Sequence, residues 1–263
     1  MRLLVKMEAI STCKYNKEYH YNLQGFIYGL IKKSPYHDVH DKKGYKFFCF
    51  SNIFPVKDLR IGEKFNLLIS SPNLEFIDNI EEAINRRIIT NSKIQIGSMV
   101  FKIEFTKRFE YTFNQGSLVT MITGTPIIVR IPRHKYKEYQ INPPVNYDYI
   151  FWRNTHPVNL FIQQIENNLL MKYHLYYKND IGLNINKNIG GIDYNKTFIQ
   201  QFRFKKQIAT KINMKGSSHI IIGSLWEFTF NIDINCEVFR FVLDVGLGER
   251  NSLGFGFMNI KVN

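Results

Sequence analysis

An α+β fold of two tandem ferredoxin-like (RRM-like) domains, the second one degraded, is predicted by the order of the hydrophobic patterns along the chain. Up to Thr106 the patterns follow the order strand, helix, strand, strand, helix, strand, which is the split β-α-β order of that fold. A less regular series of strands and one helix comes next. We place the two domains at residues 1–110 and 117–263 and the joint between them at Lys107–Ser117.

In the first domain, alternation with a period of two predicts strands and helical spacing predicts helices. Apolar and polar side chains alternate along Arg2–Ala9, which indicates a strand with one buried face. Apolar residues recur at helical spacing in Tyr21–Lys33, and Pro35 follows as a stop signal. The other expected elements are strands at Lys46–Ser51, Phe65–Ser70 and Lys93–Thr106 and a helix at Glu75–Ile89.

The second domain is predicted from weaker patterns. Leu118–Ile131 is strand-like with an interruption at Thr123–Pro126, and Pro132–Tyr149 is typical of an irregular insertion because it is rich in Tyr, Lys and Pro. Pro157–Tyr173 has helical spacing, whereas Lys178–Tyr194 is rich in Asn and Gly and is predicted to be a loop. Further strands are expected at Phe198–Ala209, His219–Asp233, Val238–Val245 and Phe257–Val262.

The composition narrows the class of protein. The chain has 263 residues, 44% of them hydrophobic and 15% aromatic, which excludes a disordered chain. The net charge of +13 favours a polyanionic partner, either nucleic acid or an anionic membrane surface. The helical segments are too apolar for a basic amphipathic helix, so we expect no membrane partner. No apolar run suits a membrane span, and the three cysteines are too few for a disulfide framework, so we expect a cytoplasmic protein.

The positive charge is concentrated towards the two ends of the sequence. The stretch Lys196–Lys215 holds six basic residues and no acidic one. Such a run can be a solvated face, but two separate basic regions in one compact chain can also form a single groove. That second arrangement favours nucleic-acid binding.

A glycine-rich segment near the C-terminus is the most specific feature of the sequence. It contains two Gly-X-Gly units, Gly246/Gly248 and Gly254/Gly256, with Arg250 between them. Glycines allow close approach of the backbone to a ligand, and such a loop can present N–H groups to phosphate. It is neither a P-loop nor a dinucleotide-binding motif, because no Gly-Lys-Ser/Thr and no helix follows. The alternative is an ordinary connection between strands.

A loop with histidines and lysines, Ser34–Lys46, provides candidate catalytic groups. RNA supplies its own nucleophile, the 2′-hydroxyl, so its cleavage requires a base, an acid and a cation near phosphorus. The groups that suit these roles are His40 with His37, then Tyr28 or Tyr45, and Lys46. Two alternatives remain, namely a polar loop without chemistry and a metal site formed by His37, Asp38, His40 and Asp41.

With these residues identified, the chain resembles the CRISPR-associated endoribonucleases that process repeat transcripts into guide RNAs, which belong to the superfamily of repeat-associated mysterious proteins. The similarity covers nearly the whole length. It is carried by Arg2–Lys33, by His40-Asp41 with Gly44–Phe48, by Phe50–Ile53, Thr125–Arg130 and Asn168–Tyr173, and by Gly246–Gly256.

The resemblance implies tandem ferredoxin-like domains with a basic cleft for a repeat hairpin. It also implies metal-independent cleavage on the 3′ side of that hairpin, leaving a 5′-hydroxyl and a 2′,3′-cyclic phosphate. The family's catalytic histidine corresponds to His40, with His37 as the alternative, and its tyrosine and lysine correspond to Tyr28 and Lys46. Other members use two histidines from this loop, and some relatives only bind RNA.

Our hypothesis from the sequence is a repeat-processing endoribonuclease that needs no cofactor or metal. The alternative is a non-catalytic subunit of an effector complex that binds repeat RNA. The expected partner is CRISPR repeat RNA, as a hairpin or single-stranded, and association with other effector subunits or with a second copy of the chain stays open. The expected RNA-binding residues are Arg203, Lys205, Lys206, Lys211, Lys215, Gly246, Gly248, Arg250, Gly254 and Gly256.

Overall fold

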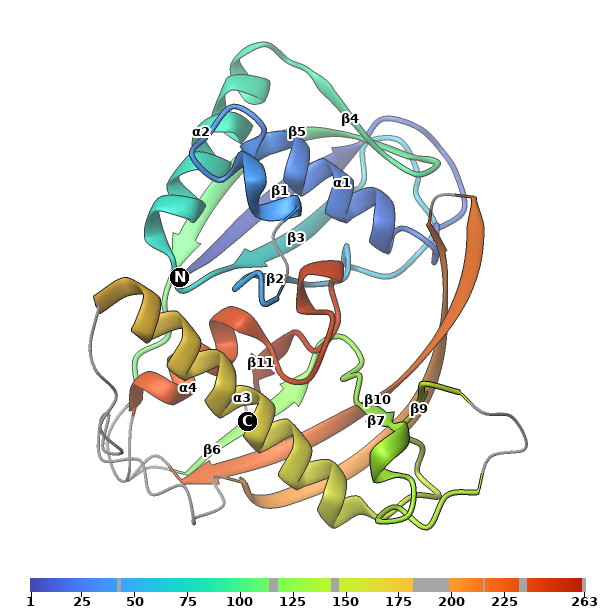
Figure 1. Cartoon of the computed structure of the whole chain (residues 1–263). Coiled ribbons are helices and arrows are strands. Elements are labelled where there is room, and N and C mark those ends of the chain that lie inside the picture. Colours follow the sequence, from blue (N-terminus) through green and yellow to red (C-terminus); the bar gives the residue numbers. More distant parts are fainter. Residues whose placement is uncertain are drawn as a thin grey trace. The chain divides into compact units, whose positions relative to one another are not determined.

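Two antiparallel sheets, each with two helices on one face, organise the chain (Figure 1). The computed structural model describes residues 1–41, 44–113, 118–142, 147–181, 199–214, 216–231 and 236–261. The chain divides into two units that are not continuous in sequence. Unit 1 consists of Met1–Tyr111, Thr210–Ile220 and Asn251–Gly254, and unit 2 of Thr112–Ala209, Ile221–Arg250 and Phe255–Asn263.

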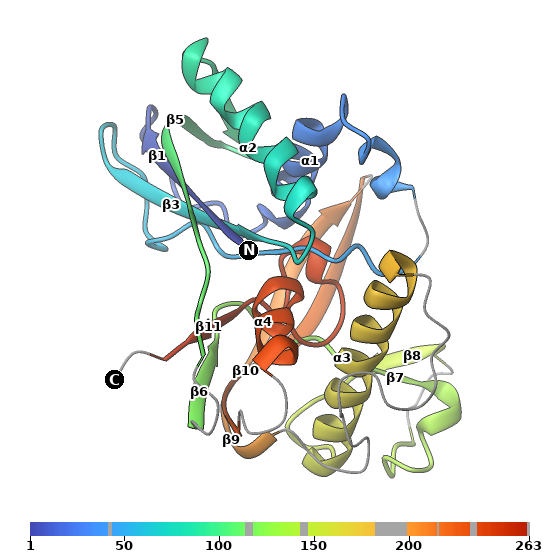
Figure 2. The same cartoon turned by 90° about the vertical axis from the view of Figure 1, so that its left-hand side faces the viewer.

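Unit 1 has the ferredoxin-like topology that the sequence predicts. Its strands pair in the order β2-β3-β1-β5-β4, with β3 and β5 antiparallel to the central β1. Helices α1 and α2 lie on the same side of this sheet (Figure 2). The elements are β1 (Arg2–Ala9), α1 (His20–Ile31), the 3-10 turn η1 (His37–His40), β2 (Cys49–Phe50), β3 (Lys64–Ser70), α2 (Leu74–Ile89), β4 (Lys93–Ile96) and β5 (Met99–Phe109).

The core of unit 1 follows from the patterns in the sequence. In β1, the alternate residues Leu3, Val5 and Met7 are fully buried, as the period of two predicts. Helix α2 begins at a side-chain cap, because the Asn73 side chain accepts a hydrogen bond from the Phe76 N–H at 3.0 Å. These local signals are the reason why both elements are found close to their predicted bounds.

Two strands of unit 1 differ from the prediction. The predicted strand Lys46–Ser51 is reduced to β2, because Phe47 has a φ of +48° and interrupts the extended backbone. The predicted strand Lys93–Thr106 is a hairpin of β4 and β5 that turns at Gly97, whose φ is +62°. The sequence contains a signal for this turn, because the alternation of apolar and polar residues shifts there by one position.

Unit 2 has the same topology, with an insertion. Its strands pair in the order β11-β6-β10-β9, and α3 and α4 lie on one face of the sheet (Figure 1). Strands β7 and β8 form a separate two-stranded ribbon. The elements are β6 (Leu118–Thr123), β7 (Arg130–Pro132), η2 (Arg133–Lys135), β8 (Tyr149–Phe151), α3 (Val158–Ile181), β9 (Ile199–Met214), β10 (Ser217–Asn231), α4 (Cys236–Val245) and β11 (Met258–Ile260). The end of β9 and the start of β10 belong to unit 1, and so does the 3-10 turn η4 (Asn251–Leu253).

The predicted strand Val238–Val245 was wrong, because this segment belongs to helix α4. Its β-branched and aromatic residues favour a strand by propensity, but Glu237, Arg240 and Asp244 are spaced as one polar stripe of a helix. With α4 in place, unit 2 has the complete order β6-α3-β9-β10-α4-β11.

The other difference in unit 2 concerns α3, which extends to Ile181 into the predicted loop Lys178–Tyr194. The rest of that loop, from residue 182 on, lies outside the described residues. Among the helices that the structure describes, none combines the length and the apolar character that crossing a membrane demands.

An aromatic core holds the sheet of unit 2 to its helices. The Trp226 ring on β10 stacks on Phe161 of α3, with ring centroids 4.8 Å apart, and Phe230 contacts Phe239 of α4 at 5.4 Å. Because side chains alternate along a strand, Glu227, between these aromatic positions, points to the opposite face of the sheet. That face carries polar side chains.

Candidate functional site

The glycine-rich segment (Gly246–Phe257) forms the turn η4 in unit 1, and one face of α1 contacts this turn. His20, Gln24 and Tyr28 are four residues apart, so they share one side of the helix. Nδ1 of His20 lies 3.0 Å from the backbone oxygen of Leu253, and Nε2 of Gln24 donates to the backbone oxygen of Ser252 at 2.9 Å. The Tyr28 hydroxyl is hydrogen-bonded to the Ser252 side chain. Three contacts therefore fix η4 on α1.

His20 serves this arrangement as a neutral hydrogen-bond donor. A carbonyl oxygen only accepts, so the ring nitrogen that faces Leu253 carries the proton. The residue is 4% exposed, its ring stacks on Tyr19 at 4.5 Å, and burial lowers its pKa to about 4. At neutral pH, His20 is thus uncharged and holds the backbone of η4 rather than transferring protons.

The two candidate tyrosines are in different surroundings. Tyr28 is partly buried, its ring meets Phe48 edge-on at 5.9 Å, and burial raises the pKa of its hydroxyl, although the bond to Ser252 acts in the opposite direction. It therefore stays protonated at neutral pH and acts as a donor, not as a base. Tyr45 is exposed, and its ring lies 6.2 Å from that of Phe47.

The predicted histidines lie in the turn η1. His37 is exposed, and its Nδ1 lies 3.1 Å from the backbone oxygen of Ser34, which places the proton of the neutral ring on Nδ1. Nε2 then carries the lone pair that a general base needs. His40 is the last residue of η1, and its side chain lies outside the described part of the structure. The Lys46 ammonium donates to the backbone oxygen of Val39, so it is attached to this turn.

The glycines are needed for the backbone of the segment. All four predicted glycines have positive φ, between +69° and +83°, and Arg250 between them also has a positive φ of +58°. At Gly248 a Cβ atom would lie 2.5 Å from the backbone oxygen of Ile128. Such crowding excludes any side chain at Gly248.

Several amides of this segment are occupied within the protein. The N–H groups of Gly246, Gly254 and Gly256 donate to the backbone oxygens of Val242, Asn251 and Pro126, respectively, at 2.8–2.9 Å. These three groups are thus engaged, and RNA binding by the glycines stays a prediction. In contrast, the buried Nε of Arg250 has no hydrogen-bond partner among the described residues.

Lys172 was missed by sequence reasoning, although it contacts the segment directly. Its side chain is 2% exposed, and its ammonium donates to the backbone oxygens of Gly246 at 3.2 Å and Gly248 at 2.6 Å. The signal was its place on α3, because it lies three residues after Leu169 on the buried face. A lysine there needs partners for its charge, and the glycine carbonyls provide them.

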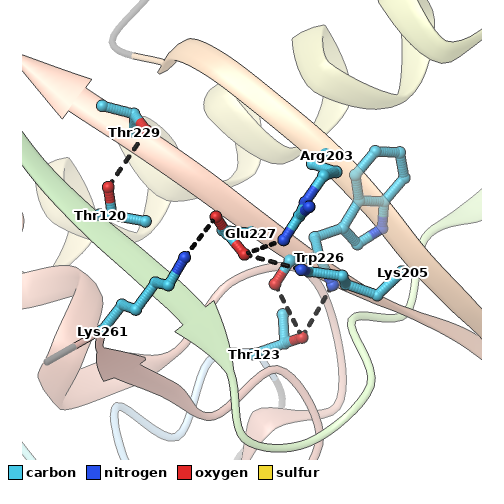
Figure 3. A network of polar contacts seen from close by, with 8 residues as sticks. All are labelled: Thr120, Thr123, Arg203, Lys205, Trp226, Glu227, Thr229 and Lys261. Atoms are coloured by element: carbon cyan, nitrogen blue, oxygen red, sulfur yellow. Dashed lines mark hydrogen bonds and ion pairs between the residues drawn. The ribbon is translucent and has the colours of Figure 1, made fainter. Parts of the chain in front are cut away.

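A cation cluster on the open face of the unit 2 sheet surrounds Glu227 (Figure 3). The carboxylate contacts Lys205 at 2.8 Å and Arg203 and Lys261 at 3.0 Å each. Hydrogen bonds from Lys205, then Lys261 and Arg203, lower the pKa of Glu227 to about 2. Three cations held by one carboxylate leave a net positive site. Sequence reasoning found Arg203 and Lys205 but missed Lys261, which is far from them in the chain.

Two further predicted cations of this region, Lys206 and Lys211, are described, and both lie outside the cluster. Lys206 is exposed, but it follows Lys205 directly in β9 and so points to the other side of the strand. Lys211 pairs with Glu18 in unit 1 at 3.1 Å. Lys215 lies outside the described residues. Among those residues, no three or more His, Cys, Asp and Glu side chains are grouped so that they could hold a metal ion.

Comparison with known proteins shows which proteins the chain resembles. Residues 106–260 match the family model "CRISPR associated protein Cas6, C-terminal". A relative from Methanocaldococcus jannaschii, "CRISPR-associated endoribonuclease Cas6 2", is 30% identical, and the alignment covers 98% of this chain and 99% of the relative. A second relative, "CRISPR-associated endoribonuclease Cas6" of Haloferax mediterranei, is 26% identical over 99% of this chain and 93% of its own length.

Among solved structures, "An RAMP protein binding different RNA substrates" superimposes with a TM-score of 0.70 at 20% identity, over the full length of both chains. A second one, "CRISPR associated protein Cas6", has a TM-score of 0.68 at 20% identity and covers 100% of this chain and 99% of its own. At this identity the two structures support the fold, which is the tandem ferredoxin-like arrangement described above.

We predict that Gly254→Ala destabilises the protein more than Gly62→Ala. Both glycines belong to unit 1 and have similar φ values, +83° and +86°, so both substitutions place a side chain in the left-handed region, at a cost of about 1–2 kcal/mol. Only at Gly254 would the new Cβ overlap the Phe50 ring, which adds about 1–3 kcal/mol. Denaturant unfolding measures the difference, and equal destabilisation would contradict the packing described here.

We also predict that His20 makes stability depend on pH. Its folded-state pKa of about 4 is below the ordinary 6.5, so the unfolded chain binds the proton first and stability falls as the pH decreases from 6.5 towards 4. The loss attributable to His20 is on the order of 3 kcal/mol. Denaturant unfolding of His20→Gln across this range should show a shallower slope than that of the wild type. Identical slopes for the two proteins would exclude this role.

Proposed function

The chain belongs to the Cas6 family of CRISPR-associated endoribonucleases, and from that premise we propose that it cuts CRISPR repeat transcripts into guide RNAs without a metal ion. The nucleophile is the 2′-hydroxyl of the nucleotide before the scissile bond. Attack on phosphorus expels the 5′-oxygen of the next nucleotide. The products carry a 2′,3′-cyclic phosphate and a 5′-hydroxyl.

One observation of unit 1 carries the proposal, namely the hydrogen bond between Tyr28 and Ser252. It brings a partly buried phenol into contact with the glycine-rich segment, whose backbone is fixed on α1 by His20 and Gln24. Phosphoryl transfer depends mainly on positioned donors and charges. The Tyr28 hydroxyl meets that requirement, because it is a donor that lies where helix α1 contacts the glycine-rich segment.

Each part of the cleavage reaction is assigned to a different side chain of unit 1. A histidine of η1, either His40 or His37, removes the proton of the 2′-hydroxyl, and Nε2 of the neutral His37 ring has the lone pair for this step. The second histidine or a tyrosine protonates the leaving oxygen. The raised pKa of Tyr28 makes it a donor to the phosphate. The Lys46 ammonium stabilises the extra negative charge at phosphorus.

The cation cluster of unit 2 supports RNA binding. A-form RNA is recognised largely through its backbone, and phosphates are bound by positioned lysine and arginine side chains. Arg203, Lys205 and Lys261 are held together by Glu227, so they present positive charge with reduced freedom. We propose that these side chains bind the repeat backbone.

We predict that one 2′-deoxy substitution at the cleaved nucleotide abolishes cutting while RNA binding changes little, because only the nucleophile is lost. Cutting of the unmodified repeat RNA should continue in EDTA. Product ends mapped by gel electrophoresis and mass spectrometry should be a 2′,3′-cyclic phosphate and a 5′-hydroxyl. Cleavage of the deoxy substrate would contradict the internal nucleophile, and loss of cutting in EDTA would indicate a metal site.

A variant that combines His37→Ala and His40→Ala provides the matched control for this experiment. It should bind the repeat RNA as the wild type does and cut it roughly a hundredfold to ten-thousandfold more slowly, the usual contribution of general acid–base groups. A wild-type protein that binds repeat RNA but yields no new ends would instead support the non-catalytic subunit.

A further inference from the structure

The β7–β8 ribbon of unit 2 has two unlike faces. In an antiparallel pair, directly opposed residues share a face, and successive residues alternate between faces. Ile131 is opposite Ile150, and Ile131 is fully buried, so this face packs on the unit. The outer face carries the other two opposed pairs, which are Arg130 with Phe151 and Pro132 with Tyr149.

The outer face exposes aromatic and cationic groups side by side. The Arg130 guanidinium lies 5.0 Å from the centroid of the Tyr149 ring, and the Phe151 ring meets that of Tyr149 edge-on at 5.6 Å. The Arg130 side chain is 41% exposed and Tyr149 is 36% exposed. Tyr147, just before the ribbon strand β8, is 52% exposed. All of these side chains are accessible to solvent, at positions where polar residues would also be tolerated.

Arg130 is fixed in place by other parts of unit 2. Its Nε donates to the carboxylate of Glu249 in the glycine-rich segment, and its backbone N–H donates to the same carboxylate at 2.9 Å. Its backbone oxygen accepts from Gln164 of α3 at 2.7 Å. Because the ring and the guanidinium are held before any ligand arrives, binding to them costs little ordering entropy.

The charge around the ribbon favours a polyanion. The described residues 130–142 and 147–153 contain five Lys and Arg side chains and only two Asp and Glu side chains. Arg133, Lys137 and Arg153 among them are exposed. Exposed aromatic rings beside arginines are the usual platform for unpaired bases, since every base has a π-face and its phosphate seeks a cation.

We propose that the outer face of the β7–β8 ribbon binds an unpaired segment of the RNA substrate, with a base stacked on Tyr149 and the adjoining phosphate at Arg130. This rests on the proposed function, because it takes the substrate to be RNA. Base-paired RNA hides the faces of its bases, so the ribbon selects single-stranded nucleotides that flank or interrupt a hairpin.

The test compares Tyr149→Ala with Tyr149→Phe by fluorescence anisotropy, with an unstructured oligouridine and with an RNA duplex of the same length as probes. Loss of the ring should raise the Kd for oligouridine about tenfold, within the range for one stacked base, whereas Tyr149→Phe keeps the ring and should stay near the wild-type Kd. The Kd for the duplex should be unchanged in both variants. Equal oligouridine affinity of the wild type and Tyr149→Ala would overturn the proposal.

A second measurement on the wild type keeps the proposal testable if Tyr149→Ala fails to fold. Oligouridine that contains 4-thiouridine is crosslinked by light, and the crosslinked peptides are identified by mass spectrometry. A crosslink in the peptide that holds Tyr149 supports the site, and crosslinks confined to other peptides exclude it. If the wild type bound no RNA, the proposed function would be overturned as well. If it cleaved the repeat normally but the ribbon did not contact RNA, only the proposal for the ribbon would be overturned.

Discussion

The backbone carbonyl groups of the glycine-rich segment are held by side chains from the first helix of each unit. In unit 1, α1 supplies His20 and Gln24 to the carbonyls of Leu253 and Ser252. In unit 2, α3 supplies Lys172 to those of Gly246 and Gly248. These side chains can reach the carbonyl groups because the glycines of the segment adopt positive φ and leave room for close contact. The position of Ser252 beside Tyr28 depends on these hydrogen bonds.

The sequence carried most of the information about the fold, because local patterns determine most of its elements. Alternation in β1 and helical spacing in α1 and α2 each correspond to one buried face, so these elements were found. Helix α4 was missed because its β-branched and aromatic residues have strand propensity, and burial against the aromatic core outweighs that preference. The hairpin at Gly97 was missed because β4 and β5 both alternate with a period of two, so that only a shift of one residue separates the two strands from one long strand.

The candidate site was less accessible from the sequence, since its contacts join residues far apart in the chain. The residue types of η1 indicated proton transfer, but nothing local showed that Lys46 is attached to the turn through Val39. Likewise, Lys261 joins Arg203 and Lys205 only because β11 and β9 belong to the same sheet. Lys172 could have been found, because a lysine on the apolar face of a predicted helix needs a partner for its charge, and the sequence alone shows this need.

The most direct measurement of the site in unit 1 is a double-mutant cycle of Tyr28→Phe and Ser252→Ala, read out by single-turnover cleavage of repeat RNA. If the two hydroxyls act as one unit, each substitution slows cleavage roughly tenfold or more, and the double variant is little slower than the slower single variant, with RNA affinity unchanged. Wild-type rates in both single variants, or fully additive losses in the double variant, would contradict a site built on the contact between α1 and the glycine-rich segment.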